Sequence, residues 1–78
     1  MHVDWFRIIT EVERSGMTQR VIANHLAVAP STVFYWKQGN QPRYAEGEAL
    51  IRLWELVTEH EAHQLPYSQE PYTRYRKR

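Results

Sequence analysis

The chain has 78 residues, no cysteine and a formal net charge of +1, so we expect one small domain without disulfides or a thiolate zinc site. No apolar run approaches the roughly 20 residues of a membrane-spanning helix, and the N-terminal residues lack the apolar core of a signal peptide. We therefore expect a soluble, cytoplasmic protein.

The charges are segregated along the chain. Residues 1–13 sum to −2, residues 14–45 to +4 without a single acidic residue, residues 46–64 to −4, and residues 65–78 to +3. A surface that approaches phosphates is disfavoured by nearby carboxylates, because like charges repel. The acid-free segment is therefore the first candidate for such a surface.

A first helix is predicted to begin after Asp4, whose carboxylate is suited to cap the first turn. Gly16 is predicted to end it, because glycine adopts positive φ angles without strain. Between these residues the apolar side chains recur at the spacing of one helical face: Trp5, Ile8, Ile9 and Val12. We expect this face to lie in the core.

Residues 18–39 indicate two short helices joined by a tight turn. Thr18 is suited to cap the first of them, whose inward residues are expected to be Ile22, Ala23 and Leu26. The turn at 27–29 is apolar and directs Val28 into the core, Pro30 suits the first turn of the second helix, and Gly39 ends it. This is the pattern of a helix-turn-helix, a motif that usually lays its second helix in the major groove of DNA.

The second helix of this motif can be oriented at about 100° per residue. If Val33 and Trp36 face the core, the far side carries Ser31, Phe34, Tyr35 and Gln38, with Thr32 and Lys37 at the flanks. An exposed phenylalanine leaves apolar surface in water unless a partner covers it. We therefore expect this face to be a binding surface.

The order of small, apolar, tryptophan and glycine positions resembles the Cro and phage-repressor superfamily of helix-turn-helix proteins, particularly small phage or prophage regulators. The resemblance covers residues 3–58 and rests on Gln19, Ala23, Val28, Ser31, Thr32, Val33, Trp36, Lys37, Gly39 and Pro42. Two positions depart from the family pattern. Ala27 replaces a turn glycine, which predicts a left-handed alanine at a cost of about 1 kcal/mol. Ala29 and Pro30 replace a hydroxyl cap and a polar residue, so Pro30 is given no base contact.

A further helix is predicted from near Tyr44 toward His63. Its main apolar stripe is Leu50, Leu53, Trp54 and Val57. Ala49, Ile51 and Leu56 make this apolar surface wider than one shallow contact within the chain requires. We expect a second copy of the chain to cover this surplus, which makes the protein a homodimer.

The predicted fold is all-α: a helix-turn-helix domain of four helices, or five, at residues 1–64, followed by an extended basic tail at 65–78. The tail contains two prolines, tyrosines and a basic terminus, and it has no helical period. It could follow a DNA groove through Arg74, Arg76, Lys77 and Arg78, pack on the acidic last helix, or act only as a solvated tail.

No catalytic arrangement has support from spacing, and Ser31 has no base placed to activate it. His60 and His63, with Glu59 and Glu61 nearby, could hold a metal ion, but a solvated helix end explains them as well. We therefore expect no enzymatic activity, no cofactor, no metal and no small-molecule substrate.

The motif and the resemblance together imply a sequence-specific regulator of transcription, a repressor, that binds double-stranded DNA as a homodimer on a two-fold symmetric operator. Such a protein acts at the nucleoid of a bacterium or a phage-infected cell. The expected base contacts are Ser31, Thr32, Phe34, Tyr35 and Gln38, with Phe34 against a thymine methyl group. The expected backbone contacts are Thr18, Gln19, Lys37, Asn40 and Arg43.

Two other functions fit the same residues. One is an accessory DNA-binding protein of recombination or packaging, of the excisionase or terminase-recognition kind, which bends or marks DNA. The other is a protein interaction module in which Phe34 and Tyr35 contact a polypeptide. Binding by such a module would survive high salt, whereas DNA binding would not.

Overall fold

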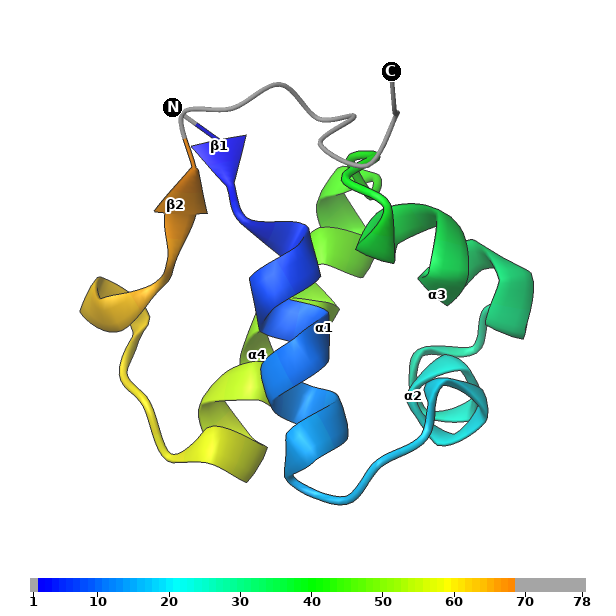
Figure 1. Ribbon diagram of the computed structural model, residues 1–78, viewed down its shortest axis with the longest axis horizontal. Coiled ribbons are helices and arrows are strands. Elements are labelled where there is room, and N and C mark those ends of the chain that lie inside the picture. The colour runs from blue at the N-terminus through cyan, green and yellow to red at the C-terminus, as the bar shows by residue number, and fades with distance from the viewer. Residues whose placement is uncertain (1, 69–78) are drawn as a thin grey trace.

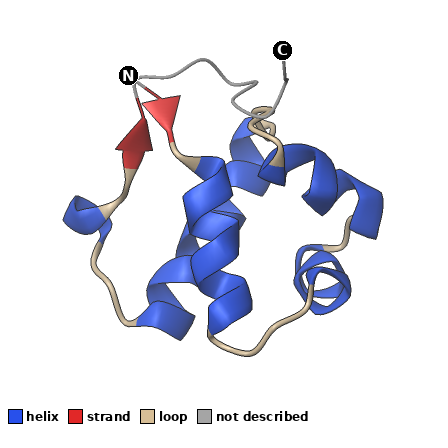
Figure 2. Ribbon diagram, viewed as in Figure 1, coloured by secondary structure: helices blue, strands red, loops and turns tan. Residues whose placement is uncertain are grey.

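The computed structural model describes residues 2–68. These residues form four α-helices, namely α1 (Trp5–Arg14), α2 (Gln19–Leu26), α3 (Pro30–Lys37) and α4 (Tyr44–Thr58) (Figures 1 and 2). α1 lies in the middle and packs against both α3 and α4, whereas α2 packs mainly against α3. The expected predominance of helices is confirmed. In this part of the chain, no helix is both long and apolar enough to cross a membrane.

The core is built from the inward faces of all four helices. Its buried hydrophobic side chains are Trp5, Ile8, Ile9, Val12, Ile22, Ala23, Val33, Trp36, Leu50, Leu53 and Trp54. Leu26, Val28 and Val57 pack against this core but remain half-buried. The periodic apolar positions of the sequence thus identify the core, and the half-buried residues mark its edge.

The first two helices begin at the predicted caps. The Asp4 carboxylate accepts a hydrogen bond from the Arg7 amide at 3.1 Å, and the Thr18 hydroxyl accepts one from the Val21 amide at 3.1 Å. α2 ends at Leu26, and the next residue, Ala27, has a left-handed backbone with φ 61° and ψ 42°. The predicted left-handed alanine is therefore present in the turn.

α4 ends at Thr58, so the prediction that it continues toward His63 is wrong. Glu59 has a left-handed φ of 60°, which turns the chain away from the helix axis. The Thr58 hydroxyl donates a hydrogen bond to the Trp54 carbonyl oxygen, and its oxygen lies 2.8 Å from His60 Nδ1. A single turn of 3-10 helix, η1 (Ala62–Gln64), follows, and residues 2–68 contain no fifth α-helix.

A polar network joins α1 to the end of α4. Trp54 Nε1 donates to the Glu11 carboxylate at 2.7 Å, and Arg7 Nε donates to it at 3.0 Å. The His60 ring stacks on Trp54 with the ring centroids 4.9 Å apart. Burial raises the pKa of Glu11, but the hydrogen bonds from Trp54 and Arg7 lower it. The charges of Arg7 and His60 lower it further, so the net pKa lies below its ordinary value.

Two short strands, β1 (His2–Val3) and β2 (Tyr67–Ser68), were not predicted. They pair antiparallel, with His2 opposite Ser68 and Val3 opposite Tyr67 (Figure 2). Leu65 packs against the core. Residues 65–68 of the expected tail are thereby joined to the helical domain. The expected tail contacts Arg74, Arg76, Lys77 and Arg78 lie outside the described residues.

Candidate functional site

The outward face of α3 carries the side chains that the helical period assigned to it. Val33 and Trp36 point inward, with exposed fractions of 0% and 2%. Phe34 and Tyr35 are more than half exposed, at 53% and 57%. Ser31 and Gln38 are also exposed, while Thr32 and Lys37 are half-buried at the flanks. Four exposed polar or aromatic side chains of α3 and its C-cap are thus available to a partner, namely Ser31, Phe34, Tyr35 and Gln38, with Thr32 half-buried beside them.

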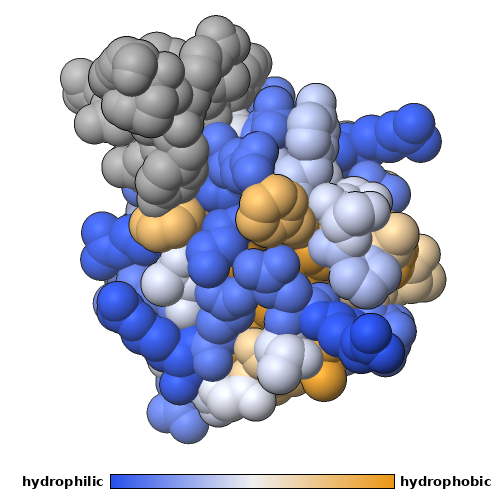
Figure 3. Space-filling view, turned by 45° about the vertical axis from the view of Figure 1, so that its right-hand side comes forward, coloured by the Kyte–Doolittle hydropathy of each residue, from blue (hydrophilic) through white to orange (hydrophobic). Residues whose placement is uncertain are grey.

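The turn at 27–29 fixes α3 relative to α2. The Val28 amide donates to the Ala23 carbonyl at 2.9 Å, and the Thr32 amide donates to the Ala29 carbonyl at 2.9 Å. Ala29 is extended, and Pro30 occupies the first turn of α3, where its missing N–H needs no helical partner. The backbone itself therefore holds α3 at the molecular surface. In Figure 3, which brings the side of α2 and α3 forward, apolar patches interrupt a mostly hydrophilic surface.

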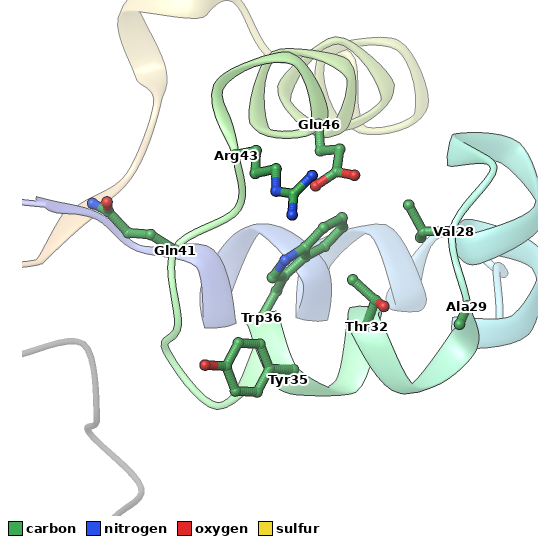
Figure 4. A pocket seen from close by; sticks show the side chains of 8 residues that line it. All are labelled: Val28, Ala29, Thr32, Tyr35, Trp36, Gln41, Arg43 and Glu46. Atoms are coloured by element: carbon green, nitrogen blue, oxygen red, sulfur yellow. The ribbon is translucent and has the colours of Figure 1, made fainter.

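A hollow of about 410 Å³ lies on one side of α3, between this helix and the start of α4 (Figure 4). Thr32, Tyr35 and Trp36 line its α3 wall. On the opposite wall, the Arg43 guanidinium and the Glu46 carboxylate point toward one another above the Trp36 ring. Arg43 is exposed and precedes α4 directly, and its guanidinium borders this hollow together with the Glu46 carboxylate.

A second hollow, of about 240 Å³, lies on the other side of α3. Its walls come from three helices and one helix cap: Phe6 of α1, Gln19 of α2, Phe34 and Lys37 of α3, and Gln38, which follows α3 directly. The Lys37 ammonium lies 5.7 Å from the centroid of the Phe6 ring. Lys37 and Arg43 therefore flank α3 from its two sides.

Glu13 contacts two of the residues expected to bind a phosphate backbone. Its Oε1 lies 2.8 Å from Lys37 Nζ, and its Oε2 accepts a hydrogen bond from Gln19 Nε2 at 2.9 Å. Sequence reasoning missed this residue, because it precedes the acid-free segment and is far from Lys37 along the chain. The helical period offered a weak signal, since Glu13 follows Ile9 by one turn at the edge of the α1 core face.

The other expected backbone contacts have structural roles of their own. Asn40 Nδ2 donates to the Tyr35 carbonyl at 2.9 Å, which satisfies one of the last carbonyl groups of α3. The Thr18 hydroxyl caps α2, as described above. Gly39 has a φ of 105° and its amide donates to the Trp36 carbonyl at 2.8 Å. Gln19 and Lys37 border the second hollow, and Arg43 borders the first.

The histidines considered as metal ligands have other neighbours. His60 stacks on Trp54, and His63 Nδ1 lies 3.4 Å from Glu61 Oε1 in an exposed pair. Within residues 2–68, no three side chains of the kinds that ligate metals are grouped together.

The apolar residues of α4 that were expected to form a dimer interface fall into two groups, one buried and one exposed. Leu50, Leu53 and Trp54 are buried within the chain's own core. Leu56 is 72% exposed and borders a hollow of about 340 Å³ between the end of α2 and α4. Ala49 lines the same hollow and is exposed as well. The apolar surface left over on α4 is therefore centred on Leu56.

Comparisons of the chain with protein-family models, with curated proteins and with solved structures found no significant match.

Proposed function

We propose that the protein is a sequence-specific DNA-binding regulator of transcription. In this proposal α2, the turn and α3 form a helix-turn-helix at residues 18–39, and α3 enters the major groove. The observation that carries the proposal is the outward face of α3, which exposes Phe34 and Tyr35 between two hollows. Lys37 borders one hollow, and Arg43 borders the other together with Glu46. The resemblance to the Cro and phage-repressor superfamily points to the same use of this face.

The side chains of this face are suited to reading base edges. An α-helix with its side chains is about 10–12 Å across, which fits a major groove about 12 Å wide. Ser31, Tyr35 and Gln38 offer hydrogen bonds to donors and acceptors of the bases, and Thr32 adds a hydroxyl at the flank. Phe34 offers apolar contact to the methyl group of thymine.

The flanking groups are suited to the sugar-phosphate backbone. Arg43 is exposed on one side of α3, and Gln19 and Lys37 lie together on the other side. Contacts of this kind fix the register of the helix in the groove without reading the sequence. With so few cations in one copy, useful affinity requires two copies on a two-fold symmetric operator. The exposed Leu56 surface is the proposed site of that homodimer.

The decisive experiment is selection of bound duplexes from a random DNA pool with the full chain. A repressor is expected to enrich one palindromic motif with half-sites about one helical turn apart. An accessory protein of recombination or packaging would instead enrich tandem sites and bend them. If no sequence is enriched and Phe34 and Tyr35 bind a polypeptide at high salt, the proposal is refuted in favour of the protein interaction module.

Substitutions on α3 test the reading face directly. Tyr35→Ala and Gln38→Ala are each expected to relax the preference at particular base pairs by about 1–3 kcal/mol. The matched control is Tyr44→Ala, which removes an 81% exposed tyrosine at the start of α4. Affinities for the selected sequence and for its single-base variants are measured for each protein. Uniform weakening across all sequences by Tyr35→Ala would contradict the assignment of this face.

A further inference from the structure

Glu13 connects three helices at one flank of α3. It lies in the last turn of α1, Gln19 is the first residue of α2, and Lys37 is the last residue of α3. Both carboxylate oxygens are used, one by the Lys37 ammonium at 2.8 Å and the other by the Gln19 amide at 2.9 Å. A negatively charged group is thus already bound by two residues suited to bind a phosphate.

The pair of Glu13 and Lys37 is shielded from solvent in part. The side chains are 25% and 26% exposed, respectively, and the ammonium also lies near the Phe6 ring. Salt screens a partly buried pair less than it screens an exposed one. A phosphate that approaches from solvent must therefore compete with a carboxylate that is held in place by the packing of α1.

We infer that Glu13 is a specificity-determining residue: its carboxylate holds Lys37 and Gln19 in the free protein and competes with a DNA phosphate for them. This inference depends on the proposed DNA binding. On DNA of arbitrary sequence, α3 is not seated in the groove and Lys37 stays paired with Glu13. On the specific site, base contacts seat α3 and bring a phosphate close enough to take Lys37 from the carboxylate.

The competition has a measurable signature in the salt dependence of binding. Each phosphate neutralised by a cation adds about 0.9 to the slope of log affinity against log salt concentration. The slope on the selected sequence should include the contribution of a contact between Lys37 and a phosphate. The slope on arbitrary DNA should lack this contribution. One such contact corresponds to an additional loss of affinity of about 3.5-fold between 50 and 200 mM salt.

The test variant is Glu13→Gln in the full chain, which removes the negative charge and keeps a similar shape. We expect its slope on arbitrary duplex DNA to rise by about 0.9, its slope on the selected sequence to stay unchanged, and the ratio of the two affinities to fall. Glu59→Gln is the matched control, because it changes the charge equally at an exposed residue just past the end of α4. The C-terminal end of α4 lies away from α3 (Figure 1).

A second variant keeps the test decisive if Glu13→Gln does not fold, which its thermal unfolding curve would reveal. Lys37→Gln is expected to leave the slope on arbitrary DNA unchanged and to lower the slope on the selected sequence by about 0.9. Equal changes of both slopes, or no change of either, overturn the role of Glu13 while DNA binding by the wild-type chain stands. Failure of the wild-type chain to bind any duplex overturns the proposed function and this inference with it.

Discussion

Replacing Ala27 by glycine is expected to stabilise the protein. Ala27 holds a left-handed backbone between α2 and α3, with φ 61° and ψ 42°, and its side chain is exposed. An L-residue in this conformation places its Cβ close to the following carbonyl oxygen, which costs about 1–2 kcal/mol. Glycine has no Cβ and avoids this strain.

The increase in the free energy of unfolding is smaller than the strain energy that is relieved, because glycine also increases the conformational entropy of the unfolded chain. This effect opposes folding by about 0.4–1 kcal/mol. The net expectation for Ala27→Gly is a rise of about 0.5–1 kcal/mol in the free energy of unfolding. For a domain of this size, that is a rise of about 2–8 °C in the midpoint of thermal unfolding.

Urea and thermal unfolding, followed by circular dichroism, measure the change. Ala45→Gly is the matched control, because Ala45 is also exposed but lies in the first turn of α4. There the same substitution is expected to lower the stability by about 0.5–1 kcal/mol. The two variants should therefore shift the midpoint in opposite directions. A loss of stability in Ala27→Gly as large as that in Ala45→Gly would refute the assignment of strain to the turn.

Glu11→Gln is expected to lower the free energy of unfolding by about 1 kcal/mol at neutral pH, because the Trp54 indole then donates its hydrogen bond to a neutral oxygen. The lowered pKa of Glu11 stabilises the fold above about pH 4, and this contribution is lost as the pH falls through the folded-state value. The difference between Glu11→Gln and wild type should thus shrink in acid, and a pH-independent difference would contradict the account. Leu53→Asp is expected to unfold the domain, since Leu53 is 3% exposed. Leu56→Asp should instead keep the fold and separate the proposed homodimer into monomers; a dimeric variant in analytical ultracentrifugation would place the interface elsewhere.

The helical core could be predicted from the sequence because its determinants are local. The spacing of Trp5, Ile8, Ile9 and Val12 selects one face of α1, and Asp4 and Thr18 cap helices through residues three positions away. The orientation of α3 followed from Val33 and Trp36 alone. The spacing of apolar residues and the capping residues were therefore sufficient to predict both the core and the outward face of α3.

The features that escaped prediction depend on contacts between distant residues. The end of α4 depends on Thr58 and on a histidine that stacks on Trp54, which no periodic pattern shows. β1 and β2 have two residues each, too few for strand alternation to be visible. The carboxylate at the flank of α3 comes from Glu13, which only the packing of α1 brings to Lys37.

The pairing of β1 with β2 also sets an order for folding. Val3 and Tyr67 close a loop over almost the whole described chain, and in an unstructured chain of that length closure costs about 3.7 kcal/mol in entropy. The pairing of two residues per strand cannot offset this entropic cost alone. Packing of α1 against α4 shortens the effective loop first, and the Asp4 amide then reaches the Pro66 carbonyl at 3.0 Å. We therefore expect the strand pair to be the last part of the described domain to form and the first to open.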